Sequence, residues 1–385
     1  MSSSQSFQVQ NIDHLGLVAG IVDEIGLVEQ INQLLGQHAT ERVSAGHAVK
    51  AMILNGLGFV SGALYMFPKF FEGKATEHLI GVGVKPEYLN DDRLGRVLDQ
   101  LYVKGLSQVF ITVALAAVKK YGVSTKTSHL DSTSFHLHGE YNTTLPSVSF
   151  KNKKDSSREG VEEQTIDVVA PQPVDITYGY SRDHRPDLKQ FILDLICSGD
   201  SDVPIFLKLA SGNQSDQKEF AQIAVDFQKQ IDLDTLMIAD SALYSAANIT
   251  LMKQIKWLCR VPLTVAYAKQ LGEQVVGEEL VKSQIDGYSY VVKASNYGGV
   301  EQRWLIVESQ ARKIADLEQL EKRVKKSTTT AQKKLQKLVS EVFACRQDAI
   351  EAAKQLSKQL KYHSLINLQF LKLNSPGKKS QKSPT

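Results

Sequence analysis

The sequence has few cysteines and no leader-like start. Its three cysteines, Cys197, Cys259 and Cys345, lie far apart in 385 residues. That spacing excludes a disulfide framework and a CxxC metal site, and it fits a chain that works in a reducing, cytoplasmic compartment. The first residues have no basic start followed by an apolar stretch, so we expect no secretory signal.

The sequence also lacks a long hydrophobic run. The uncharged segment 51–67 comes closest, but it contains Asn55 and three glycines, and Lys50 and Lys69 flank it. A spanning helix needs about 20 apolar residues. We therefore expect a buried pair of helices here and no membrane partner.

The chain as a whole has no large excess of positive or negative charge, since its net charge is only +3. The charged residues are, however, unevenly distributed along the sequence. From residue 311 to the end, 17 Lys and Arg stand against 6 Asp and Glu, a balance of +11. The rest has 28 against 36, a balance of −8. A basic C-terminal segment on an acidic body suggests a polyanion partner, although a solvated helical face fits the same composition.

Hydrophobic periodicity and turn residues divide the chain into five parts. The first is a helical domain that either binds DNA or a partner subunit, or has only a structural role in packing. The five parts are an N-terminal helical domain (1–122), an α/β core (123–262), a β-rich segment (263–308), a basic helical hairpin whose arms separate at Thr328–Thr330 (309–373) and a Ser/Pro/Lys-rich tail that we expect to be disordered (374–385).

Within the α/β core, short apolar or alternating runs predict strands, and two longer periodic stretches predict helices. The predicted helices are 216–230 and 246–254. Between the first two strands, residues 141–174 are polar and predict a loop. The predicted strands are 128–137, 175–180, 188–196, 204–209, 235–239 and 257–261.

Two aspartates stand where chemistry is often found. Asp131 lies inside an alternating strand, where a carboxylate costs free energy unless it is paired or binds a metal. Asp240 closes the apolar run 236–239, and an acid at the end of a central strand is a common place for an α/β active site. Two such acids could hold Mg²⁺ ions, which prefer oxygen ligands.

Other interpretations of these residues stay open. An Asp after a strand is often a turn former or a helix cap. Asp131 as the nucleophile of a phosphohydrolase would call for a second Asp two residues later, and that position is Thr133. A zinc site on His136 and His138 would need a third ligand, and no suitable spacing is evident.

A basic turn precedes the strand that we expect from residue 188. Arg182, His184, Arg185 and Lys189 fall within eight residues. Arg182, Arg185 and Lys189 are candidate contacts to DNA phosphates, because guanidinium forks match phosphate oxygens. Pairing of the arginines with neighbouring aspartates fits the sequence equally well.

Four segments together resemble the transposases of the insertion sequence 4 family. They are His129–Gly139, Gly179–Gln190, Gly212–Asp216 and Ile238–Ser245, and the second is the most specific. The resemblance covers about residues 10 to 370. It implies a ribonuclease H-like fold with Asp131 and Asp240 as the first two of three catalytic acids. It also implies Mg²⁺ or Mn²⁺ dependence, cleavage and joining of double-stranded DNA at element ends and at a target, and a homo-oligomer on DNA near the bacterial nucleoid.

One family feature is missing. The family's third acid lies in a Tyr-x2-Arg-x3-Glu-x6-Lys helix, and no residues of this chain have that spacing. Glu308 follows a strand-like run and belongs to the β-rich segment rather than to such a helix. We therefore expect an incomplete acid set, and a catalytically inactive DNA-binding remnant or inhibitor is the alternative to an active transposase.

Overall fold

We describe the protein from a computed structural model, which covers residues 9–37, 40–141, 173–181, 183–231 and 234–371. The predicted disordered tail and nearly all of the predicted loop 141–174 lie outside these residues. Two compact units are present. The first contains Met1–Lys269 with Asn296–Gln302, and the second contains Gln270–Ser295 with Arg303–Thr385.

The first unit begins with the helices that the periodicity predicts. Asn90 caps α6 by accepting a hydrogen bond from the amide of Arg93 at 2.9 Å. Gly26, with a φ of 73°, ends α1 and starts α2. The elements are α1 (Leu15–Ile25), α2 (Leu27–Leu35), α3 (Ala45–Gly56), η1 (Leu64–Met66), α4 (Phe67–Phe71), α5 (Thr76–Leu79), η2 (Pro86–Tyr88), α6 (Asp91–Lys104) and α7 (Leu106–Tyr121).

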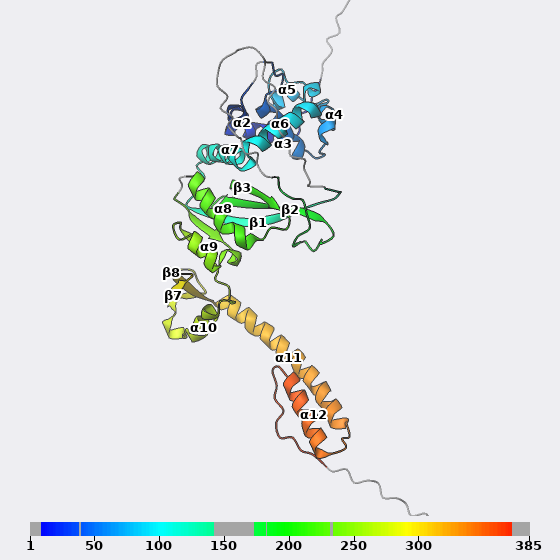
Figure 1. Ribbon diagram of the computed structural model, residues 1–385, viewed down its shortest axis with the longest axis vertical. Helices are drawn as coiled ribbons and strands as arrows, with labels where there is room; N and C mark the ends of the chain where they lie inside the picture. Colours follow the sequence, from blue (N-terminus) through cyan, green and yellow to red (C-terminus); the bar gives the residue numbers. More distant parts are fainter. Residues whose placement is uncertain (1–8, 38–39, 142–172, 182, 232–233, 372–385) are drawn as a thin grey trace, which may run out of the picture. The chain divides into compact units, whose positions relative to one another are not determined.

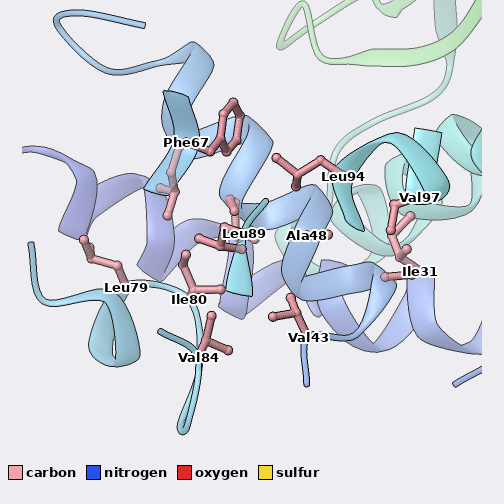
Figure 2. Close-up of a cluster of buried hydrophobic side chains, with 14 of the residues drawn as sticks. Ile31, Val43, Ala48, Phe67, Leu79, Ile80, Val84, Leu89, Leu94 and Val97 are labelled. Carbon is pink, nitrogen blue, oxygen red and sulfur yellow. The ribbon is translucent and has the colours of Figure 1, made fainter. Parts of the chain in front are cut away.

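Buried aliphatic and aromatic side chains from the α-helices form one core, against which Leu64 of η1 and Tyr88 of η2 pack. Figure 2 shows how Leu94, Leu89 and Ala48 meet in its middle. The last helix, α7, also serves the sheet that follows, since Val109 belongs to the helical core and Ile111 to the core of the sheet. The helical module is therefore joined to the sheet by a shared helix.

The predicted buried helix pair over residues 51–67 is correct only at its two ends, where Ala51 and Leu54 of α3 and Phe67 of α4 are buried. Helix α3 ends at Gly56, and the chain then forms a loop in which Phe59 is 87% exposed and Val60 is 77% exposed. No described helix is by itself long and apolar enough to span a membrane. Among the described helices, one pair, α6 and α7, would be long and apolar enough when taken together, but the two helices meet at a bend of 92°.

The rest of the first unit is a five-stranded mixed sheet with helices, which confirms the α/β class (Figure 1). The strand order is β3-β2-β1-β4-β5. Strands β1, β2 and β3 are antiparallel neighbours, whereas β4 runs parallel to β1 and to β5. The elements are β1 (Thr127–Leu137), β2 (Lys189–Ser198), β3 (Pro204–Ser211), α8 (Asp216–Gln230), β4 (Leu236–Ala239), η3 (Ser241–Leu243), α9 (Ala246–Leu251), β5 (Trp257–Cys259) and α10 (Ala266–Gln274), which continues into the second unit.

One face of this sheet holds the core. Even-numbered residues of β1 and β2, such as Leu130 and Ile196, are buried beneath α7 and α8, where Phe220 and Phe227 fill the space. The odd-numbered residues of β1 from His129 to Phe135 are exposed. The alternation therefore places Asp131 on the less covered face.

One predicted strand is wrong and one is too long. Residues 175–180 form no strand, because only Thr177 bridges to Gln190 before the chain turns away. The strand predicted over 257–261 ends at Cys259, and the helix predicted to residue 254 ends at Leu251. Each boundary depends on pairing or packing that a local pattern does not contain.

The second unit has a three-stranded sheet in the order β6-β7-β8 and a helical hairpin. The predicted break at Thr328–Thr330 is wrong, because each Thr hydroxyl donates to the carbonyl four residues earlier and the helix continues through them. Helix α10 is a second departure, since that stretch was expected to be β-rich. The elements are η4 (Gly277–Glu279), β6 (Val281–Lys282), β7 (Tyr288–Tyr297), β8 (Val300–Ser309), α11 (Gln310–Ser340) and α12 (Arg346–Gln359).

Candidate functional site

The structure brings Asp131 and Asp240 together. The last residues paired between β1 and β4 are Leu130 and Ala239, so the two aspartates are the next positions in that parallel register. Asp240 keeps an extended backbone, with φ −74° and ψ −175°, and so continues the line of β4. Neighbouring strands are about 4.8 Å apart. Two acids distant in sequence thus become neighbours on one sheet face.

Backbone amides orient both carboxylates. The Oδ1 atom of Asp131 accepts a hydrogen bond from the amide of Ser132 at 2.8 Å. The Oδ1 atom of Asp240 accepts one from the amide of Ala242 at 2.8 Å, which also caps η3. Asp240 is therefore a helix cap, as the alternative interpretation of this residue predicts. The same hydrogen bond fixes the direction of one of its carboxylate oxygens.

The acids influence the thiols on the flanking strands. Burial, and then the charge of Asp240, raise the pKa of Cys259 to about 12. Burial, and then the charges of Asp202 and Asp131, raise the pKa of Cys197. Cys259 pairs with Ala239 and Cys197 pairs with His129, so the thiols stand on β5 and β2, the strands that flank β4 and β1.

Arg260 is a neighbour of the site that the sequence interpretation missed. It follows Cys259 directly and therefore stands one position past the Ala239–Cys259 pair, beside Asp240 in strand order. Its side chain is exposed. The signal in the sequence was a basic residue directly after a short apolar run, the same kind of position that identified Asp240.

Tyr244 is a second residue that the interpretation did not assign. Its ring stacks on Tyr297 with 5.1 Å between centroids, and its hydroxyl donates to the side-chain oxygen of Gln302 at 2.8 Å. Thr250 donates to the carbonyl of Gly298 at 2.9 Å. These contacts lie within the first unit, where residues 297–302 pack against the segment that follows Asp240.

The segment Gly179–Gln190 is packed against the sheet through glycines. A Cβ atom on Gly179 would lie 1.8 Å from the carbonyl oxygen of Gly212, and one on Gly212 would lie 2.1 Å from that of Gln190. The buried amide of Gln190 donates to the carbonyls of Gly212 and Tyr180 at 2.8 and 3.2 Å. The twelve-residue motif therefore has a structural function at the edge of β2.

The candidate DNA-binding residues of this segment have internal partners. Arg185 makes two hydrogen bonds to the carboxylate of Asp187, at 2.9 and 2.8 Å, which hold the pKa of Asp187 at about 2. Lys189 donates to the carbonyl of Tyr141 at 2.6 Å. Arg182 lies outside the described residues. Their contact with DNA stays a prediction.

The histidines of β1 do not form a zinc site with described residues. His136 contacts the hydroxyl of Ser181 at 3.0 Å and the carboxylate of Asp183 at 3.4 Å. Among the residues that the structure describes, no group of three or more His, Cys, Asp or Glu side chains could hold a metal ion. Glu308, the weak candidate for a third acid, is paired with Lys313 at 3.0 Å.

A family model matches this chain, over its N-terminal part only. The model of a family described as "Domain of unknown function (DUF4277)" matches residues 7–115, which are the N-terminal helices. No curated protein matches the chain. The match to the family model ends before Asp131, so it does not bear on the two acids.

Two solved structures show a distant likeness. One is described as "Mos1 transposase paired-end complex with left transposon end", with 7% identity and a TM-score of 0.20 over 58% of this chain. The other is "Crystal structure of a pre-cleavage Mos1 transpososome", with 9% identity and a TM-score of 0.19 over 69% of this chain and 86% of that chain. This chain covers 60% of the length of the first. Likeness at these TM-scores does not define a shared fold.

Proposed function

We propose that this chain is a DNA transposase of the class that uses two aspartates and a glutamate. The observation that carries the proposal is the parallel register that makes Asp131 and Asp240 neighbours. The sequence motifs around both acids, which resemble insertion sequence 4 transposases, support the same assignment.

The topology of the sheet is consistent with the proposed ribonuclease H-like core. Three antiparallel strands are followed by a helix and two strands parallel to the first, and the acids stand on β1 and just after β4. In the arrangement implied by the resemblance, the acids also stand on the first and fourth strands. The β-rich segment and the basic hairpin would then be an insertion in that core.

The donor set suits a hard divalent cation. Mg²⁺ keeps several waters and is often held by one or two carboxylates together with substrate phosphates. Asp131 and Asp240 supply two carboxylates, and each has one oxygen aligned by a backbone amide. When bound, Mg²⁺ or Mn²⁺ activates the attacking oxygen and stabilises the leaving oxygen of a phosphodiester.

The protein's own residues would position the DNA and the acids. Asp131 and Asp240 would hold the cation beside the reacting phosphate, for water attack at an element end and then attack by the freed 3′-hydroxyl on target DNA. Arg260, next to Asp240 in strand order, offers a guanidinium to the same phosphate backbone. Arg182, Arg185 and Lys189 are proposed as further phosphate contacts, with Arg185 exchanging its bond to Asp187.

The test measures the affinity of the full chain for Mn²⁺ by electron paramagnetic resonance. Asp131→Asn and Asp240→Asn should each weaken binding by roughly tenfold or more, because Asn keeps the size of the side chain and loses its charge. Asp234→Asn is the matched control, since Asp234 precedes β4 at its other end and pairs with Lys256. Equal Mn²⁺ affinity in the wild type and both site variants would refute the assignment.

Binding without cleavage is the second candidate function. The observation that favours it is that no Tyr-x2-Arg-x3-Glu spacing occurs in the 385 residues. Such a chain would occupy element ends, alone or in mixed multimers, and hold metal weakly. Nicking of a supercoiled plasmid in Mn²⁺ that depends on Asp131 would reject it, whereas DNA binding with no nicking would support it.

A further inference from the structure

The outer face of α11 carries a row of lysines that the proposed active site does not use. From Lys322 to Ser340 the helix contains six lysines and Arg323, and no acidic residue. All six lysines are exposed, and we call the four that lie on one line of the helix, Lys322, Lys326, Lys333 and Lys337, the lysine stripe. None of the four has an ion pair or side-chain hydrogen bond to another described residue.

Helical geometry gathers these four residues on one line. At about 100° per residue they fall within an arc of roughly 60°, and at about 1.5 Å per residue they span roughly 22 Å. Thr329 and Thr330 lie between them, and their hydroxyls are turned back to the carbonyls of Lys325 and Lys326. The stripe is therefore a straight and purely basic surface.

The opposite side of α11 is already occupied. Its less exposed residues recur at heptad spacing and face α12, whose Ala353 and Leu356 are buried. These residues are Val324, Thr328, Ala331, Leu335 and Leu338. They lie roughly 170° around the helix from the stripe. Packing against α12 thus fixes which way the lysines point, and the stripe is a consequence of the fold of the hairpin.

The chemistry of the stripe fits the phosphates of a double helix better than a membrane or a single strand. A helix that lies on a membrane needs an exposed apolar face with large side chains, and here the apolar face is covered by α12. Single-stranded nucleic acid is bound mainly by stacking on aromatic rings, and α11 contains none. Duplex DNA offers about one phosphate per 1.7 Å of axis, so four lysines can all find partners.

We infer that the lysine stripe docks on the phosphate backbone of duplex DNA and positions it without reading its sequence. The inference takes its DNA partner from the proposed function, but it does not depend on the site at Asp131 and Asp240. Neutralising four phosphates gives a slope of log K against log salt of about −3.6. Between 50 and 200 mM salt, the stripe alone then accounts for a loss of affinity of roughly 10²-fold.

The test measures binding of the full chain to a fluorescent 30-base-pair DNA duplex across a NaCl series. Replacing the four stripe lysines together with Gln should make the salt slope shallower by about 3.6. A variant with Lys325, Lys354, Lys358 and Lys361 replaced by Gln removes the same charge from the same hairpin, away from the stripe. Circular dichroism checks that both variants keep their helices.

The control should lose less than half as much slope as the stripe variant. An unchanged slope in the stripe variant, or equal losses in the two, overturns the inference. Tighter binding of the wild type to double-stranded RNA, single-stranded DNA or anionic vesicles than to the DNA duplex also overturns it. Asp131→Asn should keep the full slope, so a failure of cleavage and a failure of the stripe give different results.

Discussion

Asp131 and Asp240 occupy adjacent positions in the parallel register of β1 and β4, one step past the pair Leu130–Ala239. Each carboxylate accepts a hydrogen bond from a backbone amide one or two residues further along the chain. The fold thereby holds two negative groups side by side on the less covered face of the sheet. Because like charges repel, each acid should affect what the other can bind.

The first prediction concerns this coupling. If both acids hold the same cations, the losses in Mn²⁺ affinity caused by Asp131→Asn and Asp240→Asn should not add in the double variant. Removing the second carboxylate from a site that is already broken costs less, and residues in contact couple by about 0.5–3 kcal/mol. The measurement is a double-mutant cycle by paramagnetic resonance, and strict additivity would indicate separate sites.

The second prediction concerns the glycines behind the motif 179–190. In Gly212→Ala the new Cβ would lie 2.1 Å from the carbonyl oxygen of Gln190 and 2.6 Å from that of Thr177. Backbone atoms must move, so the substitution should destabilise the first unit by about 1–3 kcal/mol or more. The change in the free energy of unfolding is measured by urea denaturation, with tryptophan fluorescence as the signal.

Gly20→Ala is the control for this prediction. Gly20 lies inside α1, and a Cβ atom there would meet nothing within 4 Å. Alanine in the interior of a helix is favoured over glycine by about 0.5–1 kcal/mol, so this variant should be slightly more stable. If both variants shifted the midpoint in the same direction, the close contact at Gly212 would not be the cause.

The sequence was sufficient for the elements that carry the two acids. Alternation predicted β1 to within a residue, and the short apolar run before Asp240 predicted β4. The bounds predicted for α8 are those observed. These elements obey local rules, because their buried faces repeat at the period of a strand or a helix.

The remaining features depend on contacts between distant residues. Nothing in residues 175–180 shows that Gly179 packs on the carbonyl of Gly212, which is why a strand was expected there. The register that joins Leu130 to Ala239 depends on the whole sheet. The partners of Arg185 and Lys189 also became evident only in three dimensions, because their motif alone fits phosphate as well as Asp187 and Tyr141.

The third prediction uses Cys259 as a reporter of the charge on Asp240. An ordinary thiol has a pKa near 8.5, so its alkylation rate levels off by about pH 10. Burial and Asp240 raise the pKa of Cys259 to about 12, so its rate should still be rising at that pH. Exposed Cys345 should react first. Mass spectrometry of peptides after timed alkylation distinguishes the thiols.

Asp240→Asn should lower the pKa of Cys259 and speed its alkylation at a fixed pH, because one of the two causes is removed. The change should be partial, since burial is the larger cause. Asp234→Asn, at the far end of β4, should leave the rate unchanged. Levelling of the wild-type rate near pH 9 would contradict the prediction.

The fourth prediction concerns the acid stability of the helical module. Burial, and then the charge of Lys50, lower the pKa of His47 below its usual 6.5, and the nearby carboxylates of Glu29 and Asp23 offset this only in part. The ring also contacts the hydroxyl of Ser44 at 3.0 Å, an arrangement that neutral histidine satisfies. In the folded chain His47 therefore stays neutral at a pH where the unfolded chain takes up a proton.

The sign of the effect follows from this difference. As pH falls below about 6.5, the unfolded state binds more protons than the folded state, so the free energy of unfolding decreases. The urea midpoint of the first unit should therefore fall between about pH 7 and 5.5, before carboxylates protonate appreciably. His47→Gln should remove part of this dependence, and His78→Gln, at an exposed position of the nearby helix α5, serves as the matched control. A steeper acid dependence in His47→Gln would show that the histidine gains, rather than loses, proton affinity on folding.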